Sequence, residues 1–137
     1  MMKQILTFFI LVGLTACGGK NISPQTGLVG TWRLKSYCKT TSSSTPCTPT
    51  VVPNDKSVYL SFASNLKFNE TYDNVRPAEH AFFGCGPGSY KMEDGNVRIY
   101  ASCMSSLSGR LVKLISVSDK ELILDPYDTG NYVFERR

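Results

Sequence analysis

Few side chains in this sequence could do covalent chemistry, and their spacing limits the chemistry. His80 is the only histidine, and a catalytic base at this position would pair with Glu79 or with a serine. No Gly-x-Ser-x-Gly turn is present to supply a nucleophile for it. We therefore expect no catalytic residue, and we predict that the protein is not an enzyme.

The cysteines are spaced too widely for a metal site. Zinc sites use Cys-x₂₋₄-Cys pairs, whereas the shortest spacing within the main part of the chain runs from Cys38 to Cys47. The glycine-rich stretch GCGPG at 84–88 lacks the Lys-Ser/Thr ending of a phosphate-binding loop. We expect neither a metal nor a cofactor.

The N-terminus has the pattern of a signal peptide. Lys3 precedes the apolar run ILTFFILVGL at 5–14, which is shorter than the ~20 residues that span a bilayer. The next residues, Leu14-Thr15-Ala16-Cys17, resemble the bacterial lipobox. This resemblance implies cleavage after residue 16, a diacylglycerol on the Cys17 sulfur and a further acyl chain such as palmitate on its amine. Two or more chains anchor a protein stably. Gly18 rather than Asp after the cysteine implies the outer membrane, facing the periplasm.

The rest of the chain forms one domain on a short tether. Residues 17–27 contain the lipidated cysteine and a polar, Gly/Ser/Pro-rich stretch, and the domain occupies 28–137. Lys3 is the only charged residue in 1–16, so the remaining 121 residues carry a net charge of +3 instead of +4. Their basic residues are scattered, so we expect no nucleic-acid partner.

The domain alternates between apolar and polar residues, as strands do. In the first strand we expect Trp32, Leu34 and Ser36 on one face, with Tyr37 on the other. A long loop at 39–55 follows, and no window shows a helical stripe. We therefore predict an all-β fold, a single small antiparallel barrel of about eight strands, because closure removes sheet edges. The expected strands are 27–38, 57–62, 66–75, the end of 76–92, 97–103, 110–117, 121–124 and the C-terminal NYVFERR.

Four cysteines remain besides Cys17, and an even number in an exported protein indicates disulfides. Of the three pairings that four cysteines allow, we favour Cys38–Cys47 and Cys85–Cys103. The first would close the base of the long loop. For the second, a turn at Asp94-Gly95 sets the hairpin register and places Gly86 opposite Cys103, so a bulge at 86–88 would bring Cys85 into reach.

Two short motifs resemble known families. Gly30-Thr31-Trp32 is similar to the Gly-x-Trp signature of lipocalin-like barrels. That resemblance implies that Trp32 packs across the closed end of the barrel against an arginine of the last strand, here Arg136. The second resemblance is to the META domain of bacterial envelope proteins. It rests on Gly84-Cys85, Gly88-Ser89-Tyr90, EDGNVRIYAS at 93–102 and Cys103-Met104.

The sequence identifies no ligand-binding residues. Several aromatic residues could fill the core or could line a barrel mouth: Tyr59, Tyr72, Phe82, Phe83, Tyr100 and Tyr127. Our leading hypothesis is a non-catalytic envelope lipoprotein that binds a small apolar ligand or an envelope protein. An inhibitor of a lysozyme or protease that inserts loop 84–90 into a cleft is the alternative, and a purely structural protein is the third.

Overall fold

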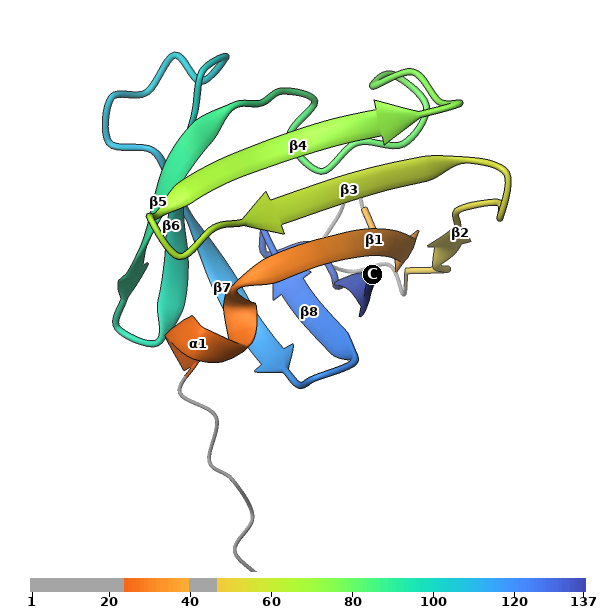
Figure 1. Cartoon of the computed structure of the whole chain (residues 1–137). Helices are drawn as coiled ribbons and strands as arrows, with labels where there is room; N and C mark the ends of the chain where they lie inside the picture. The colour runs from red at the N-terminus through yellow and green to blue at the C-terminus, as the bar shows by residue number, and fades with distance from the viewer. Residues whose placement is uncertain (1–23, 40–46) are drawn as a thin grey trace, which may run out of the picture.

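The computed structural model describes residues 24–39 and 47–137. The predicted signal peptide, Cys17 and most of the tether lie outside this range, as does part of the long loop. The described chain contains one helix and nine strands (Figure 1). In chain order they are α1 (Pro24–Leu28), β1 (Gly30–Tyr37), β2 (Thr50–Val51), β3 (Ser57–Phe62), β4 (Lys67–Asp73), β5 (Gly88–Glu93), β6 (Asn96–Ala101), β7 (Arg110–Val117), β8 (Glu121–Asp125) and β9 (Tyr132–Arg136).

Eight of the strands form a closed up-and-down barrel. β1 pairs with β3, and each later strand pairs antiparallel with the next one in sequence up to β9. β9 then pairs back to β1, which closes the sheet. This confirms the all-β antiparallel barrel, and β3 and β7 have the predicted bounds. The two-residue strand β2 lies on β1 within the segment predicted as loop.

The inner face of the barrel is packed with apolar side chains. In β3, Val58, Leu60 and Phe62 alternate inward and are 0–1% exposed, as the sequence pattern predicts. The aromatic members pack edge-on, with the ring centroids of Phe62 and Tyr90 5.0 Å apart. The other members of the core include Leu28, Trp32, Leu34, Phe68, Phe82, Val97, Ile99, Val112, Leu122, Leu124, Tyr132 and Phe134.

No helix is predicted from the sequence, but α1 forms one short turn before the barrel. Five residues are too few to show a helical period, although Pro24 suits the first position of a helix. Leu28 is fully buried, and its carbonyl accepts the indole N–H of Trp32 at 2.8 Å. α1 is thus part of the core, and within the described residues no helix is long and apolar enough to cross a membrane.

A β-bulge in β1 reverses the direction in which the side chains at the end of the strand point. The pairing with β9 shifts between Leu34 and Ser36, and a bulge redirects the side chains beyond it. Tyr37, predicted to face water, instead stacks on Tyr132 with a centroid distance of 5.2 Å.

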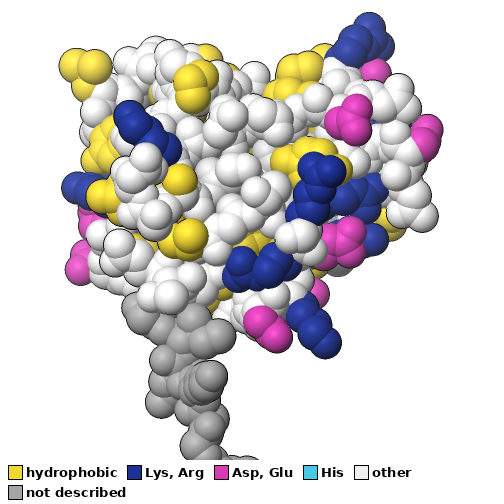
Figure 2. Space-filling view, in the orientation of Figure 1, with side chains coloured by type: hydrophobic (Ala, Val, Ile, Leu, Met, Phe, Trp, Pro, Cys, Tyr) yellow, Lys and Arg dark blue, Asp and Glu magenta, His cyan; other side chains and the backbone are white. Residues whose placement is uncertain are grey.

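The barrel has two distinct ends. The closed end carries α1 and the short turns at 63–66, 94–95 and 118–120. The opposite end, which we call the mouth, carries the described parts of longer connections, at 38–39, 47–56, 74–87, 102–109 and 126–131. Basic and acidic side chains are interspersed on the face in Figure 2.

Candidate functional site at the barrel mouth

The closed end is sealed by Trp32 and Arg136. These residues are paired across β1 and β9, and the guanidinium carbon of Arg136 lies 4.1 Å from the centroid of the Trp32 ring. Arg136 also donates to the carbonyls of Gly27 and Val29, at 2.7 and 2.9 Å. This is the arrangement that the lipocalin-like motif implies, and it leaves the mouth as the accessible end.

The structure contains both favoured disulfides, Cys38–Cys47 and Cys85–Cys103. The hairpin register is as predicted, with a left-handed Asp94-Gly95 turn. The predicted bulge is absent, because the β5–β6 ladder ends at the Gly88–Ala101 pair and Cys85 lies outside it. The second disulfide ties the β4–β5 connection to the β6–β7 loop at the mouth.

The β4–β5 connection closes the upper part of the barrel from inside. β4 pairs with β5 only at Lys67 and Phe68, so the sheet separates beyond them. Phe82 enters the gap and is 1% exposed. Its ring lies 5.3 Å from that of Tyr132 and 5.7 Å from that of Phe134. The space that would hold a ligand in an open barrel is thus occupied by the protein's own side chain.

A buried carboxylate holds this segment in place. Glu70 points inward from β4, is 4% exposed, and accepts the backbone N–H groups of Phe82 and Phe83, both at 2.9 Å, and that of Gly84 at 3.3 Å. The Tyr72 hydroxyl also donates to it. Burial and the Glu70 carboxylate raise the pKa of the Tyr72 phenol, which keeps this donor protonated. We call residues 82–84 the plug.

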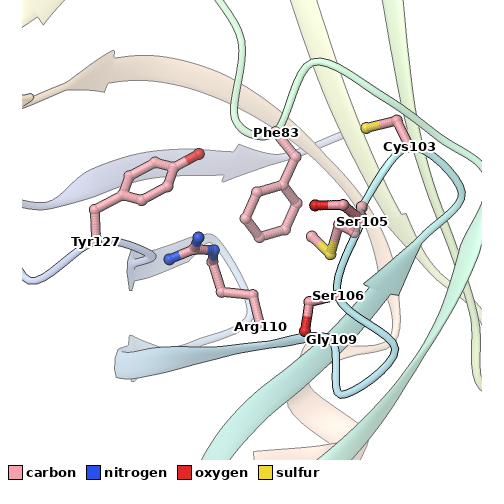
Figure 3. Close-up of a pocket in the computed structure, with 8 residues that line it drawn as sticks. Phe83, Cys103, Ser105, Ser106, Gly109, Arg110 and Tyr127 are labelled. Atoms are coloured by element: carbon pink, nitrogen blue, oxygen red, sulfur yellow. The ribbon is translucent and has the colours of Figure 1, made fainter.

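Above the plug, the mouth contains a pocket of about 250 Å³ (Figure 3). Tyr127 and Phe83 form one side, and the β6–β7 loop forms the other with Ser105 and Ser106. Tyr127 is anchored to the plug, because its hydroxyl donates to the Phe82 carbonyl at 3.0 Å. We call this cavity the mouth pocket; its lining is Phe83, Cys103, Met104, Ser105, Ser106, Gly109, Arg110 and Tyr127.

The mouth pocket is cationic. The guanidinium of Arg110, at the first position of β7, lies 5.0 Å from the centroid of the Tyr127 ring, and Lys39 Nζ lies 5.8 Å from it. Burial raises the pKa of the Tyr127 phenol, while the charge of Arg110 acts in the opposite direction. The phenol is therefore a neutral donor, and two positive charges approach its ring.

The β6–β7 loop that forms the far wall is well defined. Gly109 has φ +65°, and a Cβ there would lie 2.5 Å from the Ile99 carbonyl oxygen. The Ser108 carbonyl accepts Arg98 Nη1 at 3.1 Å, and the Gly109 N–H donates to Ser106. The wall opposite Tyr127 is thus held by the barrel itself.

The other residues considered from the sequence lie away from this pocket. His80 Nδ1 lies 3.2 Å from the Tyr37 hydroxyl, whereas the Glu79 carboxylate pairs with Lys56 and Arg76 and does not orient the imidazole. Glu93 lies at the end of β5 and forms ion pairs with Lys91 and Arg98. No group of three His, Cys, Asp or Glu side chains in 24–39 and 47–137 could hold a metal ion.

Loop 84–90 does not project from the surface. Gly86 lies so close to β4 that a Cβ would be 2.6 Å from the Glu70 nitrogen. On the other side, the Ser102 N–H donates to the Pro87 carbonyl at 2.9 Å. This packing favours the ligand-binding hypothesis over insertion of the loop into an enzyme cleft.

Strand order defines the domain as a closed, antiparallel up-and-down barrel, and its Trp32–Arg136 pair is the one that the lipocalin-like motif implies. Among solved structures, it is similar to a lipocalin-like protein from Bacteroides uniformis, with 13% identity and a TM-score of 0.46 over 81% of this chain and 99% of that one. It is also similar to an uncharacterized protein from Bacteroides eggerthii, with 16% identity and a TM-score of 0.42 over 80% and 99%. Comparisons with family models and with curated proteins found no match, so the META resemblance stays a prediction.

Proposed function

We propose that this protein is a non-catalytic, lipid-anchored envelope protein that binds a small ligand in the mouth pocket. The observation that carries this proposal is the division of the barrel into a filled interior and a walled pocket above it. Phe82 occupies the interior, while Tyr127, Arg110 and the β6–β7 loop leave a cavity of about 250 Å³. Concave sites with apolar walls and a few placed polar groups are typical of ligand binding.

The position of α1 supports the predicted anchoring. The helix begins at Pro24 on the closed end, so a tether of only seven residues, 17–23, connects it to the lipid predicted at Cys17. Such a tether spans at most ~25 Å. A lipid at Cys17 would therefore hold the closed end near the outer membrane and turn the mouth toward the periplasm.

Native mass spectrometry of the protein purified from its own cells tests this function. We expect the mass of a lipidated chain that starts at Cys17, two disulfides and a retained small molecule. Ser106→Trp, which fills the pocket, should remove the small molecule, whereas Ser116→Trp on the outer face of β7 should keep it. Equal retention by both variants, or no retained molecule in the parent protein, contradicts the proposal.

A second candidate is binding of an envelope protein through the same end. Leu107 is 99% exposed in the β6–β7 loop, beside the mouth pocket. Together with Tyr100, Ala101 and Met104 it lines a shallow, mostly apolar hollow, and exposed apolar patches mark protein-interaction sites. Cross-linking in the envelope would favour this candidate if Leu107→Ser abolished a specific adduct while the retained small molecule was unchanged.

A further inference from the structure

The charge of the mouth pocket is not balanced within the part of the chain that the structure describes. Several basic side chains elsewhere on the barrel form ion pairs with carboxylates: Arg33 with Glu135, Arg98 with Glu93, and Lys113 with Asp128. By contrast, no described carboxylate lies within ion-pair distance of Arg110 or Lys39. The pocket therefore offers positive charge to a ligand.

The guanidinium of Arg110 is available for hydrogen bonding. The guanidinium carbon of Arg110 lies 5.0 Å from the centroid of the Tyr127 ring, and this cation–π contact uses none of the guanidinium N–H donors. None of them is used by another described residue. A guanidinium whose N–H groups are free can bind a carboxylate through two parallel hydrogen bonds. Ser105 and Ser106 place two hydroxyls on the side opposite Tyr127 (Figure 3).

The remaining walls suit a flat apolar group. The rings of Phe83 and Tyr127 are nearly perpendicular, at 87°, with centroids 6.4 Å apart. Met104 adds an adaptable thioether that packs against the core. At about 250 Å³ the pocket is smaller than the ~300–1,000 Å³ sites that take drug-sized molecules, so its ligand is small.

We propose that the mouth pocket binds a small aromatic carboxylate, with the carboxylate on Arg110 and the ring against Phe83 and Met104. This assignment rests on the proposed function, because it names the ligand class of the same pocket. Lys39 adds long-range attraction for the anion. The proposal involves no covalent step, and the ligand leaves unchanged.

Calorimetry on the full-length protein in lipid nanodiscs tests the ligand class. The probe is naphthalene-2-carboxylate, and its neutral control is naphthalene-2-carboxamide. A charge-assisted pair with Arg110 predicts about ten- to hundredfold tighter binding of the carboxylate. Arg110→Gln should bring the carboxylate to the affinity of the amide, Arg110→Lys should lose part of the preference, and Lys120→Gln at the closed end should change nothing.

The outcomes separate the ligand class from the proposed function. Equal affinity for the two probes in the parent protein, or a carboxylate preference that survives in Arg110→Gln, overturns the assignment of an aromatic carboxylate. Failure of both probes to bind also overturns it. In each case the proposed function still stands if native mass spectrometry detects a retained molecule that Ser106→Trp removes. Thermal unfolding of each variant verifies that it is folded.

Discussion

The Glu70 carboxylate accepts the backbone N–H of Phe82 at 2.9 Å inside the barrel. This bond joins β4 to the plug across twelve residues of sequence, and it fixes the ring of Phe82 among Tyr132 and Phe134. The same segment presents Phe83 to the mouth pocket. One buried carboxylate therefore positions both Phe82, which fills the interior of the barrel, and Phe83, which lines the pocket above it.

Glu70→Gln should destabilise the protein by about 3 kcal/mol. The amide can accept at only one atom and places an NH₂ group among N–H donors, so buried donors lose their partner. Urea denaturation measures the loss, and hydrogen exchange at residues 82–84 should accelerate. Glu121→Gln is the control, because Glu121 is exposed on β8. A loss below about 0.5 kcal/mol for Glu70→Gln would contradict the role assigned to this carboxylate.

Phe82→Ala should cost about 3–5 kcal/mol, as large-to-small changes of buried aromatic residues do. The cavity left behind would be lined by apolar side chains, and such cavities bind benzene. We therefore expect benzene to raise the Tm of the variant but not of the parent protein. Phe83→Ala, at a half-buried position, should cost less. If the two substitutions cost the same, Phe82 is not the residue that fills the interior.

Arg136→Gln should weaken the closed end by about 2–3 kcal/mol. It removes the stacking on Trp32 and the hydrogen bonds to the carbonyls of Gly27 and Val29. Because Trp32 is the only tryptophan and is fully buried, its fluorescence should shift to the red as water gains access. Arg137→Gln is the matched control, since Arg137 lies over Tyr59 instead. Unchanged emission and stability in Arg136→Gln would argue against the seal.

The Glu93–Arg98 pair predicts a loss of stability in acid. Hydrogen bonds from Arg98, the larger cause, and from Lys91 lower the pKa of Glu93 from 4.5 to about 2. A carboxyl group with a lower pKa in the folded state stabilises the fold above its unfolded pKa. Its contribution should therefore disappear as the pH falls from about 4.5 to about 2. Glu93→Gln and Arg98→Gln should both make the free energy of unfolding, measured by urea denaturation, depend less on pH over this window. If both variants lose stability in acid as steeply as the parent protein, this pair is not the cause of the loss.

Local patterns in the sequence predict much of the barrel. Alternation identifies β3 and β7 with their bounds, and Asp94-Gly95 sets the hairpin register. The lipocalin-like motif places Trp32 with Arg136, because β1 and β9 must meet when the sheet closes. These features depend on adjacent residues or on closure alone, and for that reason they can be read before the structure is known.

The site itself depends on contacts that no local pattern carries. Glu70 resembles an ordinary polar residue of an alternating strand, and its partners at 82–84 lie in a segment without regular structure. Its inward register, in phase with Phe68, is the one signal that could have identified it. Arg110 becomes part of the pocket only because the fold brings the start of β7 next to Tyr127, in the β8–β9 connection. The bulge that turns Tyr37 inward is equally invisible in the alternation.

The most direct test of ligand binding at the mouth is a map of NMR chemical-shift changes in the full-length protein on addition of naphthalene-2-carboxylate. We predict that the changes are confined to the mouth, at Phe83, Met104, Ser106, Arg110 and Tyr127. Changes centred on inner-face residues such as Val97, Ile99 and Leu122 would show that the ligand displaces the plug and enters the barrel, and would contradict this account.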